Sequence, residues 1–283
     1  MQVTSPHSSS EEMPDRTLQF TKIVAAVIIP FLVAAFIILA FLPEATGRRF
    51  AWEINPAMTA VWMGTGYLGG AYFFLRVLLS KRWHRVSAGF WGVMAFTWAM
   101  LLVTALHWSR FDITHLPFQI WLVLYVVTPF LVPVVWWHNH AVDPGVPEAN
   151  DVVVPAFARV GMGLVGVFML ASCLLSFAAP NAVVAFWPWA LTPLTARILG
   201  GWFALMGAGA LALAREERWS GWRYQVESII FVWHALLLLG AFVHADEFKP
   251  GTVWFFVIEV AVILALLVFY IGMQRQAASD RGG

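Results

Sequence analysis

Three ionisable side chains lie within long apolar stretches in the second half of the chain: Arg197, His234 and Glu259. Charged groups are costly in hydrocarbon, so such residues usually face the interior of a helical bundle or a water-filled cavity. At about 1.5 Å per helical residue, all three lie roughly 12 to 15 Å below the same surface. We therefore expect them to meet and to form a binding site for a small solute, an ion or a proton.

Each of the three residues has a chemical part in this hypothesis. Glu259 is the titrating carboxylate, because no other acidic residue lies as deep in an apolar stretch. Arg197 supplies a fixed positive charge, and His234 is a partner whose imidazole exchanges protons near neutral pH. The alternative is a buried, neutralised pair that only fixes the register of the helices. The aligned positions of the first half, about Val61, Trp98 and Leu122, carry no charge.

A second group of candidate residues lies at the ends of apolar stretches: His107, His115 and His244. His107 and His244 are 137 positions apart (244−107), an interval that recurs along the chain. Two imidazoles at one height could ligate a transition metal or a haem iron. The favoured alternative is that His107 and His244 each cap a helix C-terminus, where the helix dipole stabilises a polar or cationic group.

Composition restricts the classes of protein to consider. The 283 residues are 60% hydrophobic and 12% charged, with a mean hydropathy of +0.75, which leaves too little polar surface for a water-soluble globule. A net charge of +1 with scattered Lys and Arg argues against nucleic-acid binding. Motifs such as GxSxG, HExxH, a Walker-type loop and CxxCH are missing, so enzymatic activity is not expected. We therefore expect the protein to be embedded in a lipid bilayer.

Eight stretches are long and apolar enough to cross a hydrocarbon core of about 30 Å. They cover residues 20–42, 56–80, 87–108, 116–137, 154–179, 190–214, 224–244 and 251–273. The sequence therefore predicts an all-α polytopic membrane protein with eight transmembrane helices. Trp52, Trp189 and other tryptophans near the ends of these stretches are expected to anchor the helices at the headgroup level.

The two halves of the chain resemble each other. Trp52, Pro56 and His107 recur 137 positions later, and several residues between them recur 136 positions later, among them Thr59, Ala60, Gly64, Arg82 and Trp83. Each half holds an even number of spans, so both halves enter the membrane from the same side. This pattern predicts two parallel four-helix repeats, related by an axis along the membrane normal.

Glycines are frequent in the second and sixth stretches, where they allow helices to approach closely. They include Gly64, Gly66, Gly69 and Gly70 in the second, and Gly200, Gly201, Gly207 and Gly209 in the sixth. One interpretation places both stretches near the pseudo-symmetry axis. The other is that each packs only within its own four-helix unit.

The chain divides into a disordered tail, two repeats, a linker and a second tail. The boundaries are 1–18 for the tail, 19–141 for the first repeat, 142–153 for the linker, 154–275 for the second repeat and 276–283 for the last tail. Of the 17 Lys and Arg residues, twelve fall on the side of the N-terminus, four on the other and one, Arg197, within a span. This bias predicts that both termini and the linker are cytoplasmic.

One pattern in the first half resembles a group of multi-pass bacterial membrane proteins to which no activity is assigned. It reads Trp52-x-Ile54-Asn55-Pro56-x-x-Thr59-Ala60 and continues with Thr104-Ala105-Leu106-His107-x-x-Arg110-Phe111. The resemblance covers most of the second and third spans and their copies. It implies a location in the bacterial inner membrane and implies nothing about the substrate.

Three hypotheses about function follow from the sequence. The leading one is a secondary transporter or permease for a small solute or ion, with its site at Arg197, His234 and Glu259. The second is a redox subunit that binds haem or a quinone through His107 and His244, or through His234. The third is a structural subunit of a larger membrane complex or homo-oligomer.

Overall fold

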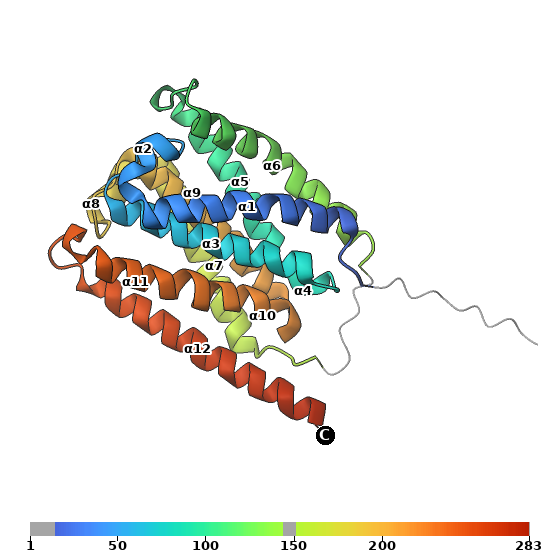
Figure 1. Ribbon diagram of the computed structural model, residues 1–283. Coiled ribbons are helices and arrows are strands. Elements are labelled where there is room, and N and C mark those ends of the chain that lie inside the picture. Colours follow the sequence, from blue (N-terminus) through green and yellow to red (C-terminus); the bar gives the residue numbers. More distant parts are fainter. Residues whose placement is uncertain (1–14, 144–150, 283) are drawn as a thin grey trace, which may run out of the picture.

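The computed structural model describes residues 15–143 and 151–282, and these residues form helices joined by short connections (Figure 1). Within them, the only strand-like contacts are two isolated β-bridges, Val153 with Arg218 and Trp189 with Phe248. Helix α1 begins and α12 ends on the same side of the molecule, which we call the terminal side. The all-α prediction is confirmed.

Seven segments within the described residues are long and apolar enough to span a bilayer. They are α1 Gln19–Phe41, α4 His84–Ser87 with α5 Gly89–Leu106, α6 Leu116–His140, α7 Ala156–Ala178, α9 Pro193–Arg215, α10 Trp219–Glu227 with η3 Ser228–His234 and α11 Ala235–Val243, and most of α12 Val253–Gly282. Short helices lie in the connections: η1 Pro43–Ala45, α2 Thr46–Arg49, η2 Trp108–Arg110, α8 Pro180–Phe186 and η4 Ala245–Glu247. By helix length and composition, the chain is a multi-pass membrane protein.

Helix α3, Ala57–Leu79, corresponds to the predicted span 56–80 but is not among the seven apolar segments. Both α3 and α1 are 23 residues long. Glycine, threonine and aromatic residues with polar atoms give α3 a lower hydropathy than α1. Most of its residues are buried, because it lies between α1 on one side and η3 and α11 on another. The expectation of eight apolar spans therefore needs correction: a helix surrounded by protein does not require a lipid-compatible surface.

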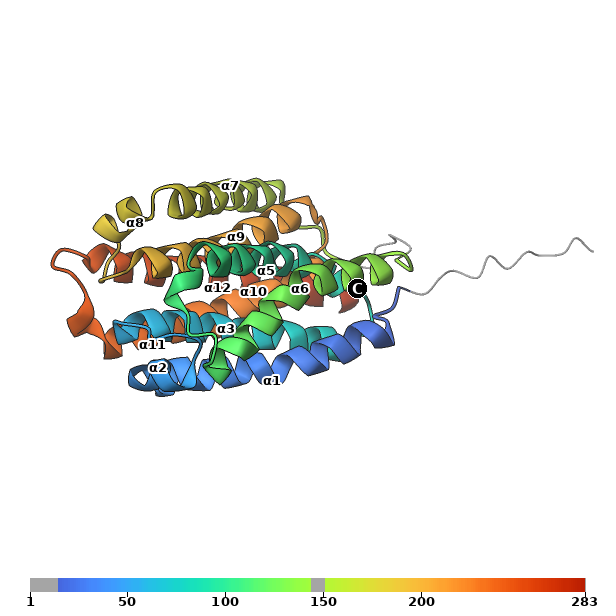
Figure 2. The same cartoon turned by 90° about the horizontal axis from the view of Figure 1, so that it is seen from above.

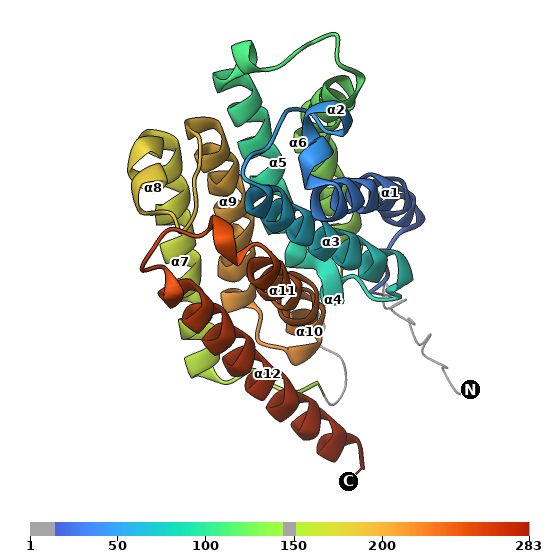
Figure 3. The ribbon, with the colours of Figure 1, turned by 60° about the vertical axis from the view of Figure 1, so that its left-hand side comes forward.

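Two long helix pairs and two crossed contacts organise the bundle (Figures 2 and 3). Helix α1 runs along α3, and α7 runs along α9. Helix α5 then packs against α9, while η3 and α11 pack against α3. Each half of the chain thus contributes a helix to the core of the other half, and the halves are not separate bundles.

The glycines of α3 and α9 do not pack only within their own halves, so that interpretation was wrong. A Cβ atom on Gly64 would lie 3.1 Å from Cβ of Leu39 in α1, and one on Gly200 would lie 2.8 Å from Cβ of Ser176 in α7. Gly66 instead faces the other half, where its added Cβ would lie 2.6 Å from the indole ring of Trp202 in α9. Close packing therefore occurs both within each half and between the halves.

Several tryptophans that were expected at the headgroup level lie inside the protein. Trp189 has no exposed surface, and Trp52 is 8% exposed. Deeper in the bundle, the rings of Trp62, Trp202 and Trp233 meet with centroids 5.4 to 5.8 Å apart. Trp137 at the end of α6 is 74% exposed and fits the anchoring interpretation. The buried indoles fill space between helices instead.

The contact between α5 and α9 allows a test of this packing. An added Cβ on Gly92 would lie 2.6 Å from the backbone oxygen of Leu205, which cannot move without shifting α9. Gly92→Ala should therefore lower the free energy of unfolding by about 1–3 kcal/mol, measured by thermal or denaturant unfolding in detergent. Gly161→Ala in α7 is the matched control, since nothing lies within 4 Å of its added Cβ. Equal effects of the two substitutions would contradict the close approach.

Candidate functional site

His234 and Glu259 meet inside the helical bundle, as predicted. Nδ1 of His234 lies 2.7 Å from Oε2 of Glu259, within hydrogen-bonding distance. Glu259 comes from α12 and is 8% exposed, and His234 ends η3 and is partly buried. The two residues lie within two different candidate spans, so the hydrogen bond joins α12 to the helix before it.

The backbone before His234 is a π-helix, η3, which the sequence pattern did not predict. Hydrogen bonds in a π-helix run from residue i to i+5, so each turn holds an additional residue. The repeat interval changes in this region, from 136 between Trp83 and Trp219 to 137 between His107 and His244. The additional residue of the second half thus falls in a helix that contains a π-helical turn, and such turns are frequent at functional sites.

Arg197 lies away from this pair, contrary to the expected cluster of three residues. Its Nη1 is 3.0 Å from Nε2 of His107, and its Nε donates to the backbone oxygen of Phe177 at 3.2 Å. The predicted stretch begins at residue 190, but α9 begins at Pro193. Arg197 is therefore only about 6 Å along the helix axis from its start. It joins the ends of α5, α7 and α9 on the side opposite the terminal side.

The contact with Arg197 defines the protonation state and the tautomer of His107. A guanidinium has only donors, so Nε2 of His107 must accept, and this requires a neutral ring with its proton on Nδ1. Burial lowers the pKa of His107, and the positive charges of Arg197 and Arg110 lower it further. His107 is thus held in the neutral form.

The histidines that were candidates for metal or haem binding are engaged elsewhere. His107 and His244 occupy the C-cap positions of α5 and α11, in agreement with the capping interpretation. Nδ1 of His244 lies 3.6 Å from a carboxylate oxygen of Glu247, and Nε2 of His115 lies 3.0 Å from the backbone oxygen of Phe50. No group of three or more potential metal ligands occurs within the residues that the structure describes.

Glu227 forms a polar cluster between helices. Its carboxylate pairs at 2.9 Å with Arg223, four residues earlier in α10, and also accepts from Arg76 and Tyr270, both at 2.9 Å, and from Tyr72. These partners come from α3, α10 and α12. Because Glu227 is 5% exposed, its charge is balanced by neighbours rather than by water. The cluster fastens three helices together.

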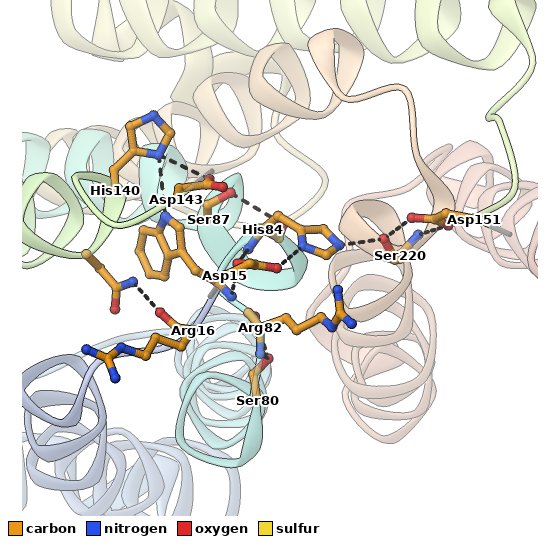
Figure 4. A network of polar contacts seen from close by, with 12 residues as sticks. Asp15, Arg16, Ser80, Arg82, His84, Ser87, His140, Asp143, Asp151 and Ser220 are labelled. Atoms are coloured by element: carbon orange, nitrogen blue, oxygen red, sulfur yellow. Dashed lines mark hydrogen bonds and ion pairs between the residues drawn. The ribbon is translucent and has the colours of Figure 1, made fainter. Parts of the chain in front are cut away.

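A chain of polar contacts on the terminal side joins the two halves (Figure 4). Nδ1 of His84 lies 2.5 Å from a carboxylate oxygen of Asp15, and Nε2 lies 2.9 Å from the hydroxyl of Ser220. That hydroxyl donates to Asp151. Burial alone would raise the pKa of Asp15, but hydrogen bonds from His84 and its charge outweigh burial and lower it.

This chain of contacts includes parts of the predicted tail and linker. Residues 1–14 and 144–150 lie outside the described residues, so those parts of the two predictions are not described. Asp15 is bound to His84, and the backbone oxygen of Arg16 accepts from the side chain of Asn139 (Figure 4). Asp151 accepts from Ser220. The described ends of both segments are thus attached to the helical bundle.

The neutral state of His107 predicts a dependence of stability on pH. The pKa of His107 in the folded protein is below the ordinary value of about 6.5. As pH falls below that value, the unfolded chain therefore binds a proton at His107 more readily than the folded protein does. Its contribution to stability is full above that value and is lost as pH falls below it. The unfolding midpoint should therefore fall less in His107→Gln than in the wild type between about pH 7 and pH 5.5. His138→Gln is the control, and identical pH profiles for the wild type and His107→Gln would contradict the assignment.

The cluster around Glu227 predicts a large loss of stability on substitution. Glu227→Ala removes the acceptor of two guanidinium groups and should lower the free energy of unfolding by about 3 kcal/mol. This value is at the low end of the range for a broken buried ion pair, because both arginines are partly exposed. Glu217→Ala removes an exposed partner of Arg159 and should cost less than about 1 kcal/mol. Denaturant titration in detergent measures both. Similar losses in the two variants would show that Glu227 does not stabilise the bundle.

Comparisons with family models, with curated proteins and with solved structures found no match to this chain. The resemblance suggested by the Trp52 to Phe111 pattern therefore has no support from these comparisons. Helix length and composition nevertheless define the class of protein. The chain is an integral polytopic membrane protein made of helices, with seven segments that qualify as candidate membrane spans within its described residues.

Proposed function

We propose that this chain is a proton-coupled transporter for a small solute or ion, and that His234 and Glu259 bind the proton. The observation that carries the proposal is the 2.7 Å contact between Nδ1 of His234 and the carboxylate of Glu259, inside two candidate spans. Ionisable residues at such positions are typical of proton relays in pumps and transporters. Arg197 has no place in this proton site, because its contacts are with His107 and Phe177.

Proton binding at this pair has a direct mechanical consequence. With one proton on the pair, a charged imidazole and a carboxylate attract each other, whereas a second proton converts the carboxylate to a neutral carboxyl and leaves only a hydrogen bond to the imidazolium. The strength of the contact between α12 and η3 therefore changes with the protonation state. The π-helical turn next to His234 is a region where the backbone can rearrange at a modest cost. Movement of α12 relative to η3 is the proposed link between proton binding and transport.

We also propose that the fold is a tandem repeat of eight membrane spans, with α3 as the eighth. Helix bounds support this proposal: α1 Gln19–Phe41 and α7 Ala156–Ala178 both begin and end 137 positions apart, and α6 and α12 begin 137 apart, at Leu116 and Val253. α5 and α11 end 137 apart, at Leu106 and Val243. Several helix ends thus fall at residues 137 positions apart, although α6 and α12 share only their start and α5 and α11 only their end.

Contacts between equivalent residues support the same proposal. His84 and Ser220 are 136 positions apart and lie within 2.9 Å of each other, and Gly66 and Trp202, also 136 apart, are in direct contact. Residues close to a two-fold axis meet their own equivalents, which residues elsewhere do not. A pseudo-two-fold axis between these two pairs accounts for both contacts. Parallel repeats of this kind occur in transporters.

The orientation of the chain in the membrane belongs to the same proposal. The twelve Lys and Arg residues on the terminal side, against four on the other, support cytoplasmic termini in a bacterial inner membrane. No geometric observation favours the haem alternative, because His107 uses Nε2 to accept from Arg197. The structural-subunit alternative stays a prediction from the sequence.

Substitution of the carboxylate tests the proposed function. In the wild type reconstituted in liposomes, infrared difference spectra between about pH 5 and pH 8 should contain a carboxylic-acid carbonyl band from Glu259, and Glu259→Gln should lack it. Electrical recording on supported membranes, with a library of small neutral solutes, should detect a proton-coupled current that Glu259→Gln abolishes. Glu217→Gln, at an exposed carboxylate, should retain both signals.

Two outcomes would contradict the proposal. One is a solute current of unchanged size in Glu259→Gln. The other is an absence of both the current and the pH-dependent carbonyl band in the wild type, since a proton site that never changes its protonation state cannot drive transport.

A further inference from the structure

A cavity of about 510 Å³ lies between α1, α3, α5 and α6, away from the His234–Glu259 pair. Apolar and aromatic side chains form most of its wall, among them Phe96, Trp121 and Trp202. Arg49 is the only charged residue in its lining, and it lies beyond the end of α1 in the short helix α2. The deep part of the cavity is therefore uncharged.

Four hydroxyl groups line this deep part, and those of Thr97 and Thr128 donate to backbone oxygens of their own helices. The other two belong to tyrosines. Oη of Tyr67 in α3 lies 3.1 Å from Oη of Tyr125 in α6, and the residues are 4% and 7% exposed. Their contact uses one of the two hydroxyl hydrogens. Neither hydroxyl has another hydrogen-bond partner among the described residues, so one buried donor is left over. An unused donor costs free energy unless a bound molecule accepts from it.

The depth of the tyrosine pair restricts the kind of molecule that fits. Tyr67 is ten residues from the start of α3, and Tyr125 is nine from the start of α6, or about 15 and 14 Å along the helix axes. The hydroxyl groups therefore lie near the middle of the hydrocarbon core. A lipid with a charged headgroup keeps that group at the membrane surface, whereas a neutral carbonyl can be carried to this depth.

The cavity is accessible from the lipid side. Phe31 of α1 and Ile120 of α6 line it and are 41% and 43% exposed, so its wall includes side chains at the outer surface of the bundle. On the terminal side, Asn139 at the end of α6 accepts from the backbone of Leu18 and from Thr21 of α1, which holds the two helices together there. An apolar tail can leave the cavity between α1 and α6 beyond this attachment.

We propose that this cavity binds a neutral isoprenoid quinone or a chemically similar lipid, with a ring carbonyl that accepts from the Tyr67–Tyr125 pair. The flat ring packs among Phe96, Trp121 and Trp202, and the tail runs out between α1 and α6. The second half of the chain has Phe203 and Val262 at the equivalent positions, which carry no hydroxyl. The site is thus particular to the first half, and it rests on neither proton coupling nor transport.

The test uses the purified full-length protein and a benzoquinone with a decyl tail. Binding is measured by equilibrium dialysis, and a photoreactive form of the same quinone is mapped by mass spectrometry. Either single Tyr→Phe substitution leaves one hydroxyl hydrogen free, so the decisive variant is the double substitution Tyr67→Phe with Tyr125→Phe. Removal of both partners of a hydrogen bond is nearly neutral for folding. Tyr224→Phe, whose ring packs on Arg76 outside the cavity lining, is the matched control.

The double variant should bind the quinone about three- to tenfold more weakly, the loss of one hydrogen bond. Tyr224→Phe should bind as the wild type does, and cross-links should fall on the helices that line the cavity, α1, α3, α5, α6 and α9. Ala35→Trp, which fills the cavity from α1, should abolish binding while the unfolding midpoint stays near that of the wild type. Equal affinity of the wild type and the double variant would overturn the proposal. So would equally strong competition by decane, which has no carbonyl, or cross-links confined to α7 and α12.

Discussion

Polar groups between the helices of a membrane protein have little water to bind, so a partner on a neighbouring helix stabilises them. This constraint accounts for the pairing of His234 with Glu259 and for the four partners of Glu227. It also accounts for Asn139, which has no exposed surface and bonds to residues on both sides of the start of α1. Polar contacts of this kind determine which helices are neighbours, because apolar side chains pack almost equally well against lipid.

Helix α3 illustrates how the same constraint affects composition. Its glycines let α1 approach at Gly64 and let Trp202 of α9 approach at Gly66. Some of its polar atoms are paired within the bundle, such as the hydroxyl of Thr59, which accepts from the indole of Trp189. A helix that is surrounded by other helices can be less apolar than a lipid-facing helix without destabilising the folded protein. Low hydropathy here is a mark of central position and not of exposure to water.

The two polar pairs near the middle of the bundle differ between the halves of the chain. The first half has Tyr67 and Tyr125, whose hydroxyl groups face an apolar cavity, and the second half has the ionisable pair His234 and Glu259. Phe203 and Val262, which follow the two tyrosines by 136 and 137 positions, carry no hydroxyl. The two halves of the chain thus place chemically different polar pairs between their helices.

The sequence alone determined the class of protein and the presence of His234 and Glu259 at similar depths in two apolar stretches, because apolar length and charge in a span are properties of single segments. Only the tertiary structure decided the partners of Arg197, since the connection after Trp189 delays the start of α9 and brings Arg197 to His107. It also decided the place of Tyr67 and Tyr125, which as uncharged residues carry no signal of depth or function in the sequence. Which side chains meet depends on the rotation and tilt of each helix, and these are set by packing against neighbours that lie far away in the chain.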